Sequence, residues 1–460
     1  MDANSQQLTA NSPAGVSIIG AGGAGLLAGL AAAREGAQTV LYERMKSPAR
    51  KVAISGGGRC NFSNTLDARQ FVKLFGDKNA SHLGHALRAF SRDELVEMLK
   101  KYGVEGQLER NYRLYTKSGR GGDVVDALVS EFVKAGGKLV TKARIMSISE
   151  QSRATESLSS KSQEPGAKSS SPLWRLEGQF AGADEIRHSR AVVVCTGGLS
   201  YPVTGSTGDG YAWARALGHG VTDLRAALVG LSVEEAWARG LQGLAWPDAE
   251  ATLWPLPASP NSAPQGQPLC RERAEILFTH FGISGPAILD VSNSFVASGL
   301  KRALLLLDFF PDLRREQLDA QLIERFKTHP NRTAGRALDG MMPNRLLEHV
   351  ETMLGADAAT LVCRLPKTAR LKLLDALKST RLTVTGTRGI EYGEVTAGGV
   401  EWNAIDPTTL ESRLHPGLFF AGEILDLTGR CGGFNLQAAF STGYLAGQNA
   451  ARKAHTKPMI

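Results

Sequence analysis

The feature that most constrains the fold is a stretch near the start of the chain, VSIIGAGGAGLLAGLAAAREGAQTVLYER, which begins at Val16. Its apolar start predicts a buried strand, and the pattern Gly20-x-Gly22-x-x-Gly25 follows directly. An alanine-rich run then predicts a helix, and a second apolar strand ends at Glu43. This order predicts a βαβ unit in a parallel α/β sheet.

Each glycine of this motif, and the acid at its end, has a physical role in binding a dinucleotide. Gly20 permits the tight turn, Gly22 lets the backbone approach a pyrophosphate, and Gly25 lets the helix pack closely on the strand. The N-terminus of the helix offers free N–H groups to the phosphates. Glu43 can accept hydrogen bonds from a ribose diol, and an acid here disfavours a 2′-phosphate. The motif therefore predicts a site for FAD or NAD.

Other stretches place glycines where predicted strands end or helices begin. AVVVCTGG ends at Gly198, GLFFAGE carries a strand into Gly422 and Glu423, and Gly432-Gly433 precede a long helix that begins near Asn435. The stretch AISGGGRCNFSN places three glycines before Arg59. Ligands of open α/β sheets bind at the carboxyl ends of strands. These stretches therefore predict one extended cofactor.

Composition limits the remaining possibilities. A chain of 460 residues predicts two or three domains. The net charge of +8, spread over this length, indicates little more than solubility. The five cysteines are widely spaced and form no CxxC, which suits a reducing cytosol and argues against a disulfide framework or a zinc site. The uncharged run 14–33 has the length of a membrane span, but its six glycines fit the nucleotide motif better.

The order of the patterns predicts how the chain is divided. We expect a disordered N-terminus (1–14), a first part of the nucleotide domain (15–205) with a flexible, serine-rich insertion (151–172), and a second part (396–455). Between them we expect a β-rich substrate domain (206–310 and 381–395) and a helical subdomain (311–380). Within the first part, Ser91-x-x-Glu94 predicts a capped helix that continues through Lys100.

Six segments, in order along the chain, resemble the BaiN/RdsA (YhiN-like) family of two-dinucleotide-binding-domain flavoproteins. They are GAGGAG, GGGRCNFSN, TGGLSYPVTGSTGDGYAWARALGH, LFTHFGISGPAILDVS, VTAGGV and PGLFFAGEILDLTGRCGGFNLQAAFSTG. The resemblance implies an α/β fold with a Rossmann-type FAD-binding domain, an inserted β-rich domain and a helical subdomain. It also implies non-covalent FAD, with NAD(P)H as a transient electron donor. Members of this family reduce unsaturated steroid-type substrates or make dihydrouridine in ribosomal RNA.

The motifs and the resemblance together predict the residues that bind the cofactor. In such flavoproteins the loop after the second strand lies along the flavin, which explains three successive glycines before Arg59. The expected FAD-binding residues are Gly20, Gly22, Gly23, Ala24, Gly25, Glu43, Arg44, Lys51, Gly57, Gly58, Arg59, Cys60, Asn61, Thr196, Gly197, Gly198, Gly422, Glu423, Gly433, Asn435 and Leu436.

Cys60 is the first candidate for catalysis, because a thiol beside a reduced flavin could protonate a carbon after hydride delivery. The alternative is a small residue packed under the ring. Tyr201 is expected to line the pocket above the flavin. Lone residues such as His280 are more often structural.

Two substrate classes remain open within this interpretation. The stretch ERNYRLYTKSGRGG, with Arg113 and Lys117, mixes basic residues and tyrosines as RNA-binding surfaces do, and it is equally typical of a mobile surface loop. The partners are therefore ribosomal RNA or a small unsaturated molecule, with no membrane and no metal, in the cytoplasm. Alternative functions are an amine or amino-acid oxidase and an FAD-binding RNA-associated factor without turnover.

Overall fold

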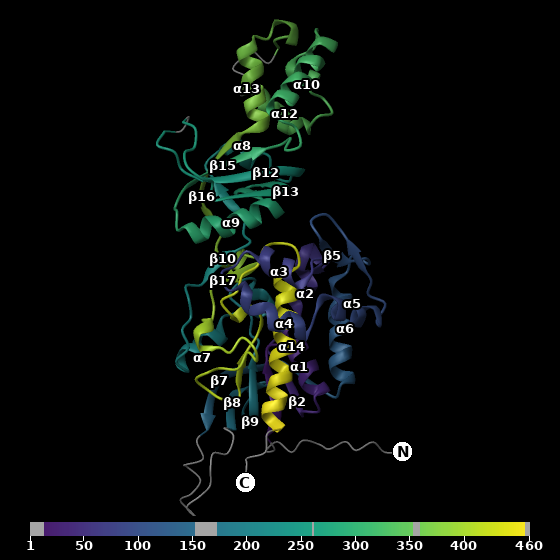
Figure 1. Cartoon of the computed structure of the whole chain (residues 1–460), viewed down its shortest axis with the longest axis vertical. Helices are drawn as coiled ribbons and strands as arrows, with labels where there is room; N and C mark the ends of the chain where they lie inside the picture. Colours follow the sequence, from purple (N-terminus) through teal and green to yellow (C-terminus); the bar gives the residue numbers. More distant parts are fainter. Residues whose placement is uncertain (1–12, 152–172, 260–261, 353–358, 456–460) are drawn as a thin grey trace, which may run out of the picture. The chain divides into compact units, whose positions relative to one another are not determined.

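The structure is a computed structural model that describes residues 13–151, 173–259, 262–352 and 359–455. The expected loose N-terminus and the expected flexible insertion at 151–172 lie, apart from their edge residues, outside this described part. The chain forms two compact units (Figure 1). Unit 1 combines residues up to Arg225 with those from Val395 onward, and unit 2 comprises Ala226–Glu394.

Unit 1 is built on a seven-stranded sheet of order β6-β2-β1-β9-β8-β7, with β18 paired to β9. The strands β1, β2, β6, β9 and β18 pair in parallel, whereas β7, β8 and β9 pair antiparallel. The strands of this sheet are β1 (Ala14–Ile19), β2 (Thr39–Glu43), β6 (Lys138–Thr141), β7 (Ala143–Gln151), β8 (Leu173–Phe180), β9 (Ala183–Val194) and β18 (Leu418–Phe420). The predicted α/β fold with a Rossmann-type sheet is confirmed.

The helices and the smaller strands of unit 1 surround this sheet. The helices are α1 (Gly23–Arg34), α2 (Arg50–Ile54), α3 (Ala68–Phe75), α4 (Leu83–Ala89), α5 (Arg92–Lys100), α6 (Gly121–Lys134), α7 (Asp209–Ala216) and α14 (Phe434–His455). A second sheet has the order β3-β5-β4, with β3 (Asn61–Asn64), β4 (Gly106–Leu108) and β5 (Arg113–Thr116). The short strands β10 (Arg225–Ala227) and β17 (Val395–Ala397) lie where the chain crosses between the units.

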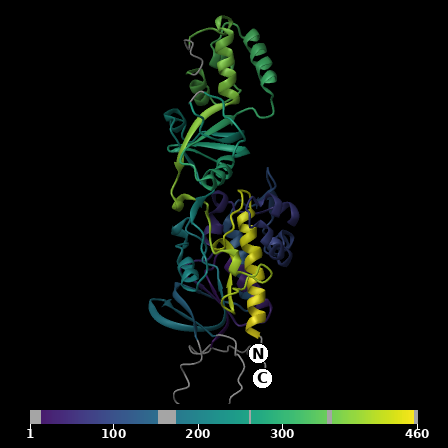
Figure 2. The ribbon, with the colours of Figure 1, turned by 60° about the vertical axis from the view of Figure 1, so that its left-hand side comes forward.

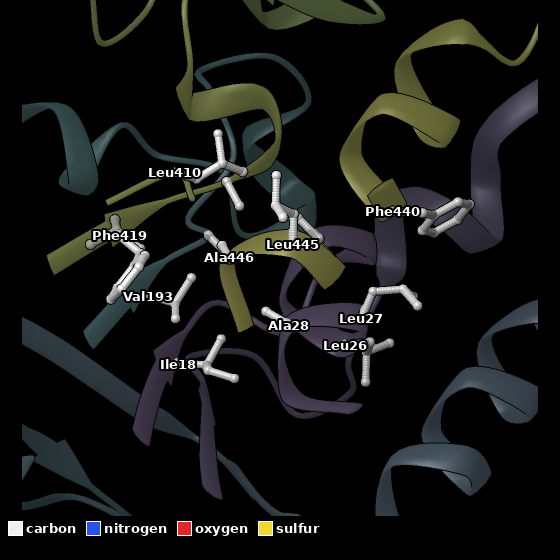
Figure 3. Close-up of a cluster of buried hydrophobic side chains, with 14 of the residues drawn as sticks. Ile18, Leu26, Leu27, Ala28, Val193, Leu410, Phe419, Phe440, Leu445 and Ala446 are labelled. Carbon is white, nitrogen blue, oxygen red and sulfur yellow. The ribbon is translucent and has the colours of Figure 1, made fainter. Parts of the chain in front are cut away.

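The helix α1 is buried on almost all sides because α14 packs along it (Figure 3). A Cβ at Gly443 would overlap the carbonyl oxygen of Ala24, and one at Gly447 would overlap that of Ala28. Close contact between the two backbones therefore requires glycine at both positions. This packing explains the long apolar run at 14–33: within the described residues, no helix combines the length and the apolar character that crossing a bilayer needs.

Unit 2 contains a closed antiparallel barrel of order β11-β14-β13-β12-β15-β16. Its strands are β11 (Leu231–Val233), β12 (Ala245–Pro255), β13 (Cys270–Thr279), β14 (Gly282–Ser284), β15 (Ala303–Asp308) and β16 (Thr380–Thr387). Its helices are α8 (Ala236–Gly240), α9 (Pro286–Ser298), α10 (Arg315–Thr328), α11 (Ala334–Ala337), α12 (Asn344–Thr352) and α13 (Lys367–Lys378). The last four follow β15 in sequence and gather at one end of the barrel (Figure 2).

The division of the chain differs from the predicted boundaries in two respects. The segment 206–225, including α7, belongs to unit 1, so unit 2 begins at 226 and not at 206. The barrel and the helices of 311–380 share one hydrophobic core, to which Leu305 and Leu322 both contribute, and they form one unit. Short apolar runs separated by loops do not reveal which unit they join, because that depends on long-range packing.

Candidate dinucleotide site

The glycine turn after β1 combines internal packing with an open approach. Gly20 has a φ of +98°, and a Cβ there would clash with the backbone of Cys195. A Cβ at Gly25 would overlap the carbonyl oxygen of Gly20. Around Gly22, by contrast, no atom of the described residues other than its chain neighbours lies within 4 Å of the position a Cβ would take. The turn therefore leaves backbone open at the N-terminus of α1, as a pyrophosphate requires.

Glu43 is fixed at the end of β2, next to this turn. Its carboxylate accepts hydrogen bonds from the backbone N–H of Ala21 at 2.9 Å and of Met45 at 2.7 Å. Burial raises the pKa of the Glu43 carboxyl, and these two hydrogen bonds partly offset that effect. The adjacent Arg44 donates to Thr207 and forms an ion pair with Asp209 at 3.2 Å.

The three-glycine loop after α2 is the second open stretch of backbone. Gly56, Gly57 and Gly58 all adopt positive φ values, between 56° and 87°. Apart from their chain neighbours, no atom in the part of the chain that the structure describes lies within 4 Å of the Cβ positions of Gly57 and Gly58. The following Arg59 lies over the ring of Tyr115 at 4.2 Å and forms an ion pair with Glu109 at 2.6 Å. The loop is therefore anchored by its arginine and open at Gly57 and Gly58, whereas a Cβ at Gly56 would lie 2.9 Å from the Tyr115 ring.

Cys60 is completely buried directly behind this loop. Burial raises the pKa of its thiol to about 11, so the thiol is neutral near pH 7. A Cβ at Gly121, where α6 begins, would lie 3.1 Å from the Cβ of Cys60. These contacts are those of a packed residue, and the catalytic role of Cys60 stays a prediction.

A polar network that joins four segments lies beside the glycines that follow β9. Lys51 donates to Glu423 at 2.8 Å and to the hydroxyl of Ser200 at 2.6 Å. Glu423 also accepts from the Ser200 hydroxyl at 2.9 Å and from the backbone N–H of Thr396 at 2.8 Å. A Cβ at Gly198 would overlap the Thr396 hydroxyl, so this position requires glycine. The sequence motifs predicted Lys51 and Glu423 as part of the site. They did not predict Ser200 and Thr396, although these two residues lie in the segments TGGLS and VTAGG.

The residue before these glycines carries an unsatisfied polar atom. The hydroxyl of Thr196 is buried and has no hydrogen-bond partner within the described part of the chain. An unsatisfied buried hydroxyl costs about 1–3 kcal/mol. Thr196 lies two residues beyond the end of β9, and its hydroxyl is close to the start of α7, where a Cβ at Gly210 would overlap it.

The turn before α14 is held by side chains that were expected to touch the cofactor. The side-chain oxygen of Asn435 accepts from the N–H of Gly429 at 2.8 Å, and its nitrogen donates to the Gly429 carbonyl at 2.9 Å. With its amide oriented to satisfy both ends, Asn61 accepts from the N–H of Gly433 at 3.0 Å. A Cβ at Gly433 would overlap the carbonyl of Ser63. Both asparagines therefore shape the loop.

The three residues expected to contact the substrate lie in different surroundings. Tyr201 is partly exposed and has a φ of +50° in the loop after β9. Arg113 on β5 lies near Gly432, and its Nε is buried with no partner among the described residues. Lys117, by contrast, forms an exposed ion pair with Glu105 at 2.6 Å. The structure thus brings Arg113 to the glycine turn before α14, whereas Lys117 is engaged elsewhere.

The parallel sheet and the glycine turns at the carboxyl ends of its strands define a Rossmann-type dinucleotide-binding fold. The model of the HI0933-like protein Rossmann domain matches residues 14–171 and 175–449, and the chain belongs to this family. The predicted family is thereby confirmed, and so is the prediction of an enzyme of the oxidoreductase class.

Two curated relatives share about a third of their residues with this chain. The ribosomal RNA dihydrouridine synthase of Escherichia coli is 30% identical over 94% of this chain and 96% of its own length. The 3-dehydro-bile acid delta(4,6)-reductase of Clostridium scindens is 30% identical over 95% and 99%. Among solved structures, the 3-ketosteroid delta1-dehydrogenase of Sterolibacterium denitrificans is similar in fold, with a TM-score of 0.51 at 12% identity over 96% of this chain and 99% of its own.

Proposed function

We propose that this chain is an FAD-dependent reductase that uses NAD(P)H to reduce a conjugated C=C bond. The observation that carries the proposal is the pairing of two open backbone stretches, at Gly22 and at Gly57-Gly58, in a family of Rossmann-type oxidoreductases. A pyrophosphate needs the first stretch, and a flat ring system needs the second. When bound, FAD supplies the hydride-transfer chemistry.

The residues of unit 1 would hold such a cofactor in three places. Glu43 has carboxylate lone pairs for the ribose hydroxyls of the adenosine half. The turn from Gly20 to Gly25 would receive the pyrophosphate, and Gly57-Gly58 would lie along the flavin ring. Thr196 and the network of Lys51 and Glu423 would meet the middle of the cofactor at the carboxyl end of β9.

The names of the two relatives give two candidate substrate classes for this chain, and both are proposals. One relative is named for dihydrouridine synthesis in ribosomal RNA, and the other for reduction of a bile-acid ring. Both names describe a C=C bond conjugated with a carbonyl group, so we propose this chemistry for the present chain. A cytoplasmic location stays a prediction, based on five free cysteines.

The experiment is anaerobic stopped-flow absorbance on the purified protein. FAD released by heat and flavin reduction by NADPH or NADH would support the reductase proposal. Reoxidation by ribosomal RNA that lacks dihydrouridine would identify the RNA substrate, and reoxidation by a 3-oxo-4-ene steroid the small-molecule class. Failure of both nicotinamides would contradict the proposal, and rapid peroxide formation with simple amines would favour an amine oxidase instead. Tightly bound FAD without any turnover would favour a binding factor.

A further inference from the structure

Unit 2 contains an arginine that is held by two aromatic rings. The guanidinium carbon of Arg388, directly after β16, lies 3.5 Å from the centre of the Tyr392 ring. It lies 4.8 Å from the centre of the Phe281 ring, which precedes β14. Two rings from separate segments therefore fix the orientation of one cation by cation–π contacts.

The backbone around these three residues is itself tied together. The N–H of Arg388 donates to the carbonyl of Gly230 at 3.2 Å, and a Cβ at Gly230 would lie 2.6 Å from the Phe281 ring. The N–H of Tyr392 donates to the Gly389 carbonyl at 3.0 Å, which closes a short 3-10 turn. The arrangement is thus built from the segments at 230, 281 and 388–392 and does not depend on a single mobile side chain.

The side-chain donors of Arg388 are unused within the described part of the chain. A guanidinium carries five N–H donors. Among the residues that the structure describes, Arg388 has no ion pair and no side-chain hydrogen bond. Two other arginines of unit 2 form ion pairs: Arg273 with Asp248 and Asp312, and Arg302 with Glu234.

The surroundings favour a flat, neutral ligand over a phosphate. Tyr392 is 51% exposed, which leaves aromatic surface beside the free donors of Arg388. The neighbouring Glu391 folds over Gly389 and brings a carboxylate into the same turn. The carboxylate of Glu391 would repel a dianion, and phosphate sites usually gather several donors.

We propose that the cluster of Phe281, Arg388 and Tyr392 recognises the conjugated carbonyl ring of the substrate. Arg388 would donate to the carbonyl oxygen, and the exposed part of Tyr392 would contact the face of the ring. The proposal rests on the proposed function, since uracil and an oxo-steroid both carry this group.

The test measures the Kd of two probes for the flavin-loaded protein: 4-androstene-3,17-dione, and ribosomal RNA transcribed in vitro, which carries unmodified uridine. Whichever probe the wild type binds, Arg388→Gln should weaken its binding about 10- to 100-fold, the range for a lost hydrogen bond to a charged group. Arg388→Lys should recover only part of this loss, because lysine lacks the planar fork. Tyr392→Phe should bind as the wild type does, and Tyr392→Leu less tightly.

Arg302→Gln is the matched control, because it removes an exposed, ion-paired arginine from the same unit. Its probe affinity should equal that of the wild type, and thermal unfolding should show every variant folded. Equal affinity of Arg388→Gln and wild type would overturn the proposal, as would a wild type that binds neither probe. If inorganic phosphate competes with the probe for the wild type but not for Arg388→Gln, then Arg388 binds an anion and not a carbonyl group, and the proposal is wrong.

The flavin content of the wild type and its reduction by NADPH are measured in the same preparation. Their absence would contradict the proposed function itself. Their presence, together with an Arg388→Gln affinity equal to that of the wild type, would contradict only the assignment of Arg388.

Discussion

Cys60 is the residue that the sequence places first as a candidate for catalysis, and the structure places it in the core. It follows Gly57 and Gly58, adopts a φ of +53°, and is fully buried in the core of unit 1 beside Gly121. Burial, the largest influence on its pKa, keeps the thiol neutral. A proton donor must reach the substrate, and a buried thiol with a raised pKa is a weak acid.

We therefore expect Cys60→Ala to bind FAD and to retain substrate turnover within about threefold of the wild type. A general acid contributes about 10²–10⁴-fold to a rate. The measurement is the rate of flavin reoxidation by substrate in stopped-flow experiments. A loss of a hundredfold or more, with normal FAD content, would show that Cys60 is the proton donor.

The same thiol should make stability depend on alkaline pH. The pKa of Cys60 rises from 9.0 to about 11 on folding, so the folded state retains a proton that the unfolded state releases. This contribution to the free energy of unfolding is complete below pH 9 and is lost as the pH rises to about 11. The free energy of unfolding, measured with urea, should therefore fall more steeply between pH 9 and 11 for the wild type than for Cys60→Ala. Parallel curves for the two proteins would contradict the assignment.

Glu43 is the residue on which cofactor affinity should depend most directly. We expect Glu43→Gln to weaken FAD binding about 10- to 100-fold, because it removes a charged acceptor and places an amide N–H near the donors of Ala21 and Met45. The measurement is equilibrium binding of FAD to the apoprotein. Glu97→Gln, on the exposed face of α5, is the control and should bind FAD normally. Equal affinity of Glu43→Gln and wild type would exclude this role.

At the scale of elements, the close packing of α14 on α1 positions the glycine turn after β1. Gly443 and Gly447 let the two helices approach until their backbones touch, and Gly422 contacts Ala24 from the end of β18. The C-terminal helix, although it is more than 400 residues away in sequence, therefore supports the helix that begins at the glycine turn.

We expect Gly443→Ala to lower the free energy of unfolding by about 1–3 kcal/mol, because its Cβ would overlap the carbonyl of Ala24 and force the helices apart. The matched control is Gly122→Ala in α6, where the new Cβ would have no described atom within 4 Å outside its own helix backbone. There the higher helix propensity of alanine should stabilise by at most about 1 kcal/mol. Denaturant unfolding measures both, and equal stability of the two variants would contradict the packing argument.

At the scale of the whole molecule, the two units have separate hydrophobic cores. Within unit 1, Val221 forms a bridge to Val400, and the N–H of Thr222 donates to the Gly399 carbonyl at 3.0 Å. The chain thus leaves unit 1 and returns to it at neighbouring positions, which is the usual arrangement of an inserted domain.

We expect a variant in which a short glycine-serine linker replaces residues 226–394 to fold and to bind FAD, because the predicted cofactor contacts lie in unit 1. It should lose reoxidation by substrate if unit 2 carries recognition. Flavin absorbance, thermal unfolding and stopped-flow reoxidation measure these properties. A folded but flavin-free variant would show that unit 2 is needed for the cofactor, and reoxidation at the wild-type rate would remove unit 2 from substrate recognition.

Sequence patterns were sufficient to predict those elements whose residues lie close together in the chain. The βαβ unit from Val16 to Glu43 and the capped helix Ser91–Lys100 were predicted and are present, with the Ser91–Glu94 capping box in place. The partners of Glu423 could not be predicted in this way, because Lys51 and Ser200 lie 372 and 223 residues away. Hydrophobic periodicity describes residues within one helix or strand and gives no information on pairs that lie so far apart in the chain.

The sequence by itself determined the class of fold, the position of the nucleotide turn and the family, because glycines and apolar periods act over a few residues. Only the tertiary structure decided that unit 2 begins at 226, that Cys60 is buried, and that Phe281, Arg388 and Tyr392 meet. These outcomes depend on which distant segments share a core. The free energy that selects them comes from long-range packing and not from local preference.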